Sequence, residues 1–149
     1  MRLSHSGGDL YNCLKAKIHE INACPAVILF MVGTIKRAAL GYFLSDEGVF
    51  HINALTPPTG LELVSGSGTV SIEKGKVMPH IHVVVADNTG NAYGGHLFPG
   101  TEVKEYVEGV LIKLKNIKFE RVWNEKIKAY PLHFHKDVNE GIKQARTTV

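Results

Sequence analysis

The chain has 149 residues, 44% hydrophobic and 21% charged, which is the composition of a folded globular protein and argues against a disordered one. Its length predicts a single domain, spanning residues 1–149, that can bury one core. The formal net charge is only +3, and the lysines and arginines are spread along the chain, so charge alone does not indicate a nucleic-acid-binding protein.

The first segment predicts an amphipathic helix. Asp9 follows two glycines and is a suitable N-cap. Apolar residues then recur at helical spacing, at Leu10, Leu14, Ile18 and Ile21. We expect the helix to end near Asn22, because residues close before Pro25 disfavour helical backbone.

Cysteine usage and the apolar stretches bear on the compartment. Cys13 and Cys24 form no CxxC motif and are too few for a disulfide scaffold, which favours a reducing, cytoplasmic location. Residues 26–32 are the most apolar stretch and are far too short to span a bilayer, and the first residues lack the apolar run of a signal peptide. We therefore expect a cytoplasmic protein without a membrane segment.

Residues 25–123 carry the pattern of short strands separated by turns. Strands are predicted at 26–32, 38–44, 49–55, 61–65, 68–72, 80–86, 92–97 and 103–114, with 118–123 pairing nearby. Glycine ends the first strand at Gly33 and separates the fourth from the fifth at residues 66–68. This pattern predicts an α+β fold: a mostly antiparallel, barrel-like β-sheet with an N-terminal helix packed on it. Residues 137–145 are expected to form a short helix or to fray.

The chemistry lies in one predicted hairpin. His80 and His82 are two residues apart on a strand, so both side chains point to the same face, while Ile81 and Val83 point to the other. Residues 88–90 (NTG) suit a three-residue loop with glycine in the left-handed conformation. Residues paired across such a loop have numbers that sum to 178, which places His96 opposite His82.

Three imidazoles on one face can hold a divalent metal at about 2.0–2.1 Å from each nitrogen, and zinc is the favoured metal. A three-histidine set leaves a fourth coordination position open, as in catalytic zinc sites. Glu62, a carboxylate within an apolar strand, is the candidate general base or the partner of a metal ligand, although an alternating strand equally places it in solvent.

The alternative is that the HxH pair is an ordinary surface feature, and a register slip of one residue would put His96 on the opposite face. A second pair, His133 and His135, lacks a third partner and is interpreted as structural or exposed. The remaining histidines, His5, His19 and His51, are isolated and are interpreted in the same way.

At this point the sequence resembles a known family. Residues 60–68 (GLELVSGSG), 79–82 (PHIH) and 94–100 (GGHLFPG), with 8–10 (GDL) and 39–43 (ALGYF), resemble the plants-and-prokaryotes-conserved (PPC) domain. The resemblance covers about residues 7–123 and leaves a C-terminal extension at 124–149. It implies an α+β barrel-like fold similar to that of acetolactate decarboxylase, homotrimeric assembly, and a metal at His80, His82 and His96.

The DNA-binding label of this family comes from plant nuclear proteins in which the domain is attached to an AT-hook. This chain has no Arg-Gly-Arg-Pro core of an AT-hook.

Three functions remain open. The favoured one is a stand-alone, metal-binding homotrimer that acts as a regulatory or DNA-associated module. The others are a metalloenzyme acting on a small acidic substrate, by decarboxylation or hydrolysis, and a structural oligomer stabilised by its metal.

Overall fold

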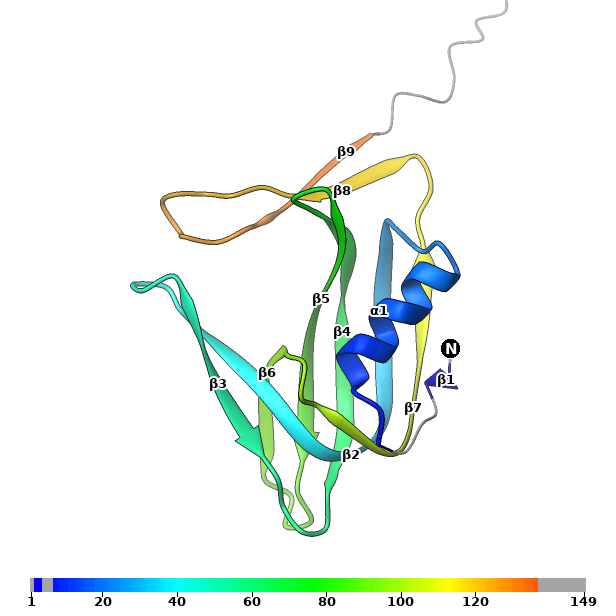
Figure 1. Ribbon diagram of the computed structural model, residues 1–149, viewed down its shortest axis with the longest axis vertical. Helices are drawn as coiled ribbons and strands as arrows, with labels where there is room; N and C mark the ends of the chain where they lie inside the picture. Colours follow the sequence, from blue (N-terminus) through cyan, green and yellow to red (C-terminus); the bar gives the residue numbers. More distant parts are fainter. Residues whose placement is uncertain (1, 4–6, 137–149) are drawn as a thin grey trace, which may run out of the picture.

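The computed structural model describes residues 2–3 and 7–136 of the chain and confirms the α+β class (Figure 1). The described residues form one helix, α1 (Leu10–Glu20), and one nine-stranded sheet. The strands are β1 (Arg2–Leu3), β2 (Ala26–Leu44), β3 (Val49–Leu55), β4 (Leu61–Glu73), β5 (Lys76–Ala86), β6 (Ala92–Leu97), β7 (Glu102–Lys113), β8 (Ile117–Arg121) and β9 (Leu132–Lys136).

Helix α1 begins at the predicted cap and covers one face of the sheet (Figure 1). The Asp9 carboxylate accepts a hydrogen bond from the backbone N–H of Asn12 at 2.8 Å, which satisfies one of the donors left free at a helix start. Leu10, Leu14 and Ile18 are buried in the same core as the inward residues of the sheet. Ile21 was predicted on this buried stripe, but it caps the helix and is exposed.

Strand β2 is continuous over 19 residues, so the prediction that Gly33 ends a strand was wrong. The glycine serves close strand packing instead, because a Cβ at this position would collide with the backbone carbonyl of Tyr106 on β7. Strand β4 is likewise continuous where a break was predicted at residues 66–68. In both places glycine permits two backbones to approach while the ladder continues.

Strand β2 is long enough to pair with two different strands, and this closes part of the sheet on itself. Its first half pairs with β4 and its second half with β6, while β4, β5 and β6 pair in sequence. These four strands therefore form a ring of hydrogen bonds around the core. The barrel-like prediction is confirmed in this sense, but the whole sheet is no closed barrel, because β1, β3, β7, β8 and β9 lie outside the ring.

The C-terminal part of the described chain forms a hairpin that the sequence only half predicted. Strand β8 pairs in parallel with the end of β4, which makes the sheet mixed, and β9 pairs antiparallel with β8. Strand β9 was missed because the segment from residue 124 onward was interpreted as polar, although Leu132 and Phe134 alternate with His133 and His135. The helix or frayed segment predicted at 137–145 lies outside the described residues.

Two simpler predictions concern cysteines and membrane segments. Cys13 and Cys24 are both free thiols. No helix within residues 7–136 has the length and apolar character needed to cross a bilayer.

Gly68 offers a direct test of the packing between β4 and β5. It pairs with Ile81, and an added Cβ would clash with the His80 carbonyl and approach the Ile81 Cα at 2.9 Å. We expect Gly68→Ala to lower the free energy of unfolding by about 1–3 kcal/mol, the usual cost of forcing atoms into a packed site. Urea unfolding followed by circular dichroism measures this change.

Gly94→Ala is the matched control on the neighbouring strand. A Cβ there would meet its nearest atoms at 3.5 and 3.7 Å, which is ordinary contact. We expect a change within about 0.5 kcal/mol, as for most exposed positions. Equal effects of the two substitutions would contradict the close approach at Gly68.

Candidate metal centre

The β5–β6 hairpin has the register that the sequence predicted. His82 lies opposite His96, and Ala86 lies opposite Ala92 at the end of the loop. Gly90 has a φ of 86°, the left-handed conformation that the three-residue loop requires. Ile81, Val83 and Val85, which alternate with the histidines along β5, are buried in the core, so the histidines point away from it.

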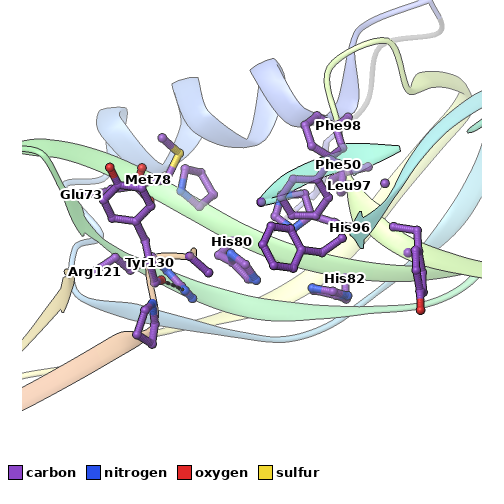
Figure 2. Close-up of a pocket in the computed structure, with 18 of the residues that line it drawn as sticks. Phe50, Glu73, Met78, His80, His82, His96, Leu97, Phe98, Arg121 and Tyr130 are labelled. Carbon is purple, nitrogen blue, oxygen red and sulfur yellow. Dashed lines mark hydrogen bonds between the residues drawn. The ribbon is translucent and has the colours of Figure 1, made fainter. Parts of the chain in front are cut away.

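Three imidazole rings meet on the face of the hairpin opposite the core (Figure 2). The ring centres of His80 and His96 are 4.6 Å apart, and the ring of His82 is 5.3 Å from each of them. One nitrogen from each ring lies within 4.8 Å of the other two. Three nitrogens this close together are a candidate ligand set for one ion such as zinc, which binds imidazole nitrogen at roughly 2.0–2.1 Å.

Neighbouring strands hold these rings from two sides. On one side β4 pairs Thr69 with His80 and Ser67 with His82, and Gly68 between them allows the close approach. On the other side the His96 ring packs 5.0 Å from the Phe50 ring and 4.9 Å from the Phe98 ring. The aromatic contacts fix the orientation of His96 and shield it from water.

The surroundings keep two of these imidazoles neutral. Burial, and then the positive charge of Arg121 and the two other histidines, lowers the pKa of His80 to about 3. Burial, and then His82 and Arg121, lowers the pKa of His96 to about 4. A neutral imidazole has a free lone pair, so both side chains are available as metal ligands at neutral pH without losing a proton.

One atom in this cluster is left without a partner. The Nδ1 of His96 is buried and has no hydrogen-bond partner within residues 7–136. A buried polar atom without a partner is energetically unfavourable, and a bound ion at the cluster would supply the missing partner. The residues present thus fit a divalent metal: three nitrogen donors, two of them held neutral, with one buried nitrogen unsatisfied.

The cluster opens into a cavity of about 1130 Å³ (Figure 2). Its wall includes aromatic side chains from distant parts of the chain, namely Tyr11, Phe43, Phe50, Phe98, Trp123 and Tyr130. Charged residues in the wall are few: Glu73, Arg121 and Lys128. An ion held by three histidines would therefore present its remaining coordination position to a space large enough for a small organic molecule.

Glu62 is not brought to this site. It pairs with Ala86, four residues beyond His82 along β5, and is exposed. The carboxylate that lines the cavity is Glu73, at the other end of β4. The catalytic role of Glu62 thus stays a prediction that its position does not favour.

The other histidines also lie apart. His133 and His135 are exposed on β9, in agreement with their interpretation, and His19 and His51 are exposed as well. His5 lies outside the described residues.

Sequence reasoning missed three residues of the site: Phe50, Phe98 and Arg121. A signal existed for Phe98, because Gly41 on β2 leaves the space that its ring fills, and a Cβ at Gly41 would clash with that ring. The turn at residues 45–48 predicts the β2–β3 pairing, and this pairing gives the position of Phe50 in the sheet. Its contact with His96, however, depends on the closure of strands β2, β4, β5 and β6. Nothing in the local sequence distinguishes Arg121 from a surface residue.

Comparison with known proteins identifies the family. The sequence profile of the Plants and Prokaryotes Conserved (PCC) domain, the PPC domain named above, matches residues 2–115. The chain belongs to this family. The match includes all three histidines of the cluster and ends before β8. No curated protein gave a match.

Three solved structures have the same fold. A metal-containing protein of Archaeoglobus fulgidus is 29% identical, with 89% of this chain and 90% of that chain covered and a TM-score of 0.79. A PPC protein of Pyrococcus horikoshii is also 29% identical, with 88% of each chain covered and a TM-score of 0.77. A Ralstonia eutropha protein, named as a candidate DNA-binding protein, is 22% identical, with 89% and 88% covered and a TM-score of 0.78. At that identity the last likeness shows the fold alone.

The low pKa values predict how the metal-free protein responds to acid. In an unfolded chain the two imidazoles titrate near 6.5, whereas folding lowers the pKa of His80 to about 3 and that of His96 to about 4. As the pH falls below 6.5 the unfolded chain binds more protons than the folded one, so stability decreases, and above 6.5 this contribution is constant. We expect a lower urea midpoint at pH 5 than at pH 7 in the presence of EDTA.

The control separates these two histidines from other titrating groups. The double variant His80→Asn with His96→Asn should show a smaller decrease between pH 7 and pH 5. His51→Asn, which removes an exposed imidazole, should keep the wild-type decrease. Equal pH dependence in the double variant and the wild-type protein would argue against buried neutral imidazoles.

Proposed function

We propose that this PCC-domain protein binds one divalent metal ion, zinc first, through His80, His82 and His96, and uses the ion to bind a small molecule in the adjoining cavity. The observation that supports this proposal is the convergence of three imidazoles, one of which carries a buried nitrogen without a partner. The name of the Archaeoglobus fulgidus relative, a metal-containing protein, agrees with it.

Zinc is the ion that this donor set suits best. Zinc accepts imidazole nitrogen, and a site with three protein ligands and one open position is typical of zinc centres that bind or activate another molecule. Calcium and magnesium prefer oxygen ligands, which the cluster does not supply. When bound, the ion would polarise a coordinated carbonyl or lower the pKa of a coordinated water.

The cavity favours a small ligand over a nucleic-acid duplex. Every ion pair within residues 7–136 joins a lysine to a nearby glutamate, as in Lys36 with Glu102 and Lys118 with Glu120. Such pairing opposes the continuous basic stripe that phosphate backbones require. A DNA-associated role therefore stays a prediction from the family resemblance. A metalloenzyme is the second candidate, favoured by the cavity beside the histidines.

Self-association into a homotrimer, as the resemblance implies, belongs to the same proposal. Phe30 on β2 lies opposite Val110 on β7, and Ile112 shares their face of the sheet. All three are 39–46% exposed, and Leu29 beside them is 56% exposed. A contiguous apolar patch of this kind typically marks a protein–protein interface.

The metal site is tested by removing one ligand. We expect the wild-type protein to bind one zinc ion per chain and His82→Ala to bind none at equal free zinc, because two remaining imidazoles hold the ion far more weakly. Elemental analysis after dialysis against buffered zinc measures the stoichiometry. Cobalt substitution adds a visible spectrum that reports the coordination number.

His133→Ala is the matched control, since it removes one histidine of the other HxH pair, on exposed β9. This variant should retain the full zinc content. Zinc retained by His82→Ala, or lost equally from both variants, would contradict the three-histidine site.

The assembly is tested by charging the apolar patch. We expect a mass near three times the 16.4 kDa of one chain for the wild-type protein, and a smaller mass for Phe30→Asp, because a buried unpaired carboxylate opposes association. Multi-angle light scattering measures both. Val122→Asp, at an exposed apolar residue past the end of β8, is the control and should keep the wild-type mass. A wild-type monomer would contradict the trimer.

A further inference from the structure

The C-terminal hairpin forms part of the cavity wall although it lies outside the family match. Residues 117–136 follow the matched range of 2–115, and Figure 1 shows the hairpin crossing over the open end of the sheet toward the β2–β3 turn. It is attached to β4 by the parallel pairing of Glu73 with Arg121. At its far end the Lys128 ammonium donates to the Asp46 carbonyl at 2.7 Å. The hairpin thus spans the cavity between two fixed points.

Arg121 is the residue of this hairpin that bears on the metal centre. Its guanidinium donates to the Tyr130 carbonyl at 2.9 Å and to the Thr69 hydroxyl at 3.2 Å. Its Nε is buried and has no hydrogen-bond partner among the described residues. A guanidinium has five N–H donors, so after these two contacts one N–H on each terminal nitrogen remains for a ligand, besides that of the buried Nε.

No carboxylate neutralises this guanidinium directly. Among residues 7–136, no ion pair within 4.0 Å involves Arg121, although Glu73 is near enough to favour its charged form. Two hydrogen bonds to neutral oxygens and one nitrogen without a partner leave this half-buried cation without a directly bound anion. The arrangement therefore leaves Arg121 able to accept an anionic partner.

The position of Arg121 places such an anion next to the proposed ion. In Figure 2 Arg121 lies on the side of His80 away from His82, in the same wall as Tyr130 and Glu73. The Thr69 hydroxyl that accepts from Arg121 belongs to the residue of β4 that pairs with His80 on β5. One small molecule can therefore contact the ion and the guanidinium together.

The charges and apolar groups of the cavity narrow the class of ligand. With a divalent ion in place, the wall carries the ion, Arg121 and Lys128 against the single carboxylate of Glu73, so the interior is positive. Glu73 close to Arg121 favours an anion with one charge over a dianion such as phosphate. The aromatic side chains around this space suit an apolar body.

We propose that Arg121 binds the carboxylate of a small organic acid with an apolar body, whose other polar group reaches the metal centre. This inference rests on the proposed function for the metal, but the carboxylate contact itself belongs to the guanidinium. Arg121 is then a specificity-determining residue, supplied by a hairpin outside the family match, that selects acids over neutral molecules of the same shape.

The test compares benzoate with benzamide, its neutral analogue of similar shape, by titration calorimetry on the zinc-loaded protein. We expect benzoate to bind more tightly than benzamide. Arg121→Gln should weaken benzoate binding about tenfold or more, the usual effect of losing a charged hydrogen-bond donor, and should leave benzamide binding unchanged. Arg121→Lys, which keeps the charge but loses the planar fork, should give an intermediate affinity.

Lys126→Met is the matched control, because Lys126 is an exposed cation of the same hairpin that does not line the cavity. It should change benzoate affinity by less than about threefold, as expected for a solvent-screened charge. If Lys126→Met weakened benzoate as much as Arg121→Gln, the effect would be one of overall charge or hairpin stability and the proposal would be overturned. Thermal unfolding of each variant checks that the fold is intact.

Three other results would also overturn the proposal: benzoate affinity unaffected by Arg121→Gln, no benzoate binding to the wild-type protein, or inorganic phosphate binding more tightly than benzoate. Failure of the metal site is recognised separately by the zinc content of the same samples. If the wild-type protein holds no zinc, the proposed function fails, and the Arg121 dependence of benzoate binding is then measured on the metal-free protein and still decides the carboxylate contact.

Discussion

The pairing of His82 with His96 is the constraint on which the candidate site depends, and a short turn maintains it. The Asp87 carboxylate accepts hydrogen bonds from the backbone and hydroxyl of Thr89 and from the backbone of Asn91, at 2.7–3.0 Å. The donation from Thr89 holds the pKa of that carboxyl well below its usual range, so the turn keeps its charge-assisted bonds at ordinary pH. A slip of one residue would move His96 to the core face and separate the three rings.

Closure of the sheet adds what the hairpin alone lacks. The long strand β2 pairs with both β4 and β6. This closed arrangement of strands brings Phe50 and Phe98 against the imidazole of His96. The resulting burial disfavours the charged form of the imidazole, so the same packing that fixes the ring also keeps its lone pair available. For His96, orientation and ligand chemistry therefore have one physical cause, the partial removal of its ring from water.

The site combines a part within the family match with a part beyond it. The three histidines and the ring of strands lie within the PCC match, whereas the β8–β9 hairpin follows it. This arrangement separates two tasks. The matched domain provides a centre suited to an ion, and the hairpin adds a cation and aromatic groups that shape the space above it. Function in such a fold depends on the residues that form the site, not on the fold alone.

The sequence by itself determined the features that depend on local geometry. The Asp9 cap, the helix, the glycine-closed turn and the opposition of His82 and His96 all follow from spacing within a few residues, and the structure agrees with each. Tertiary structure alone decided that β2 continues through Gly33, that Glu62 lies away from the histidines while Glu73 faces the cavity, and that Arg121 approaches them. These features depend on contacts between segments far apart in the chain, and no local pattern of residues encodes which strand will pass beside another.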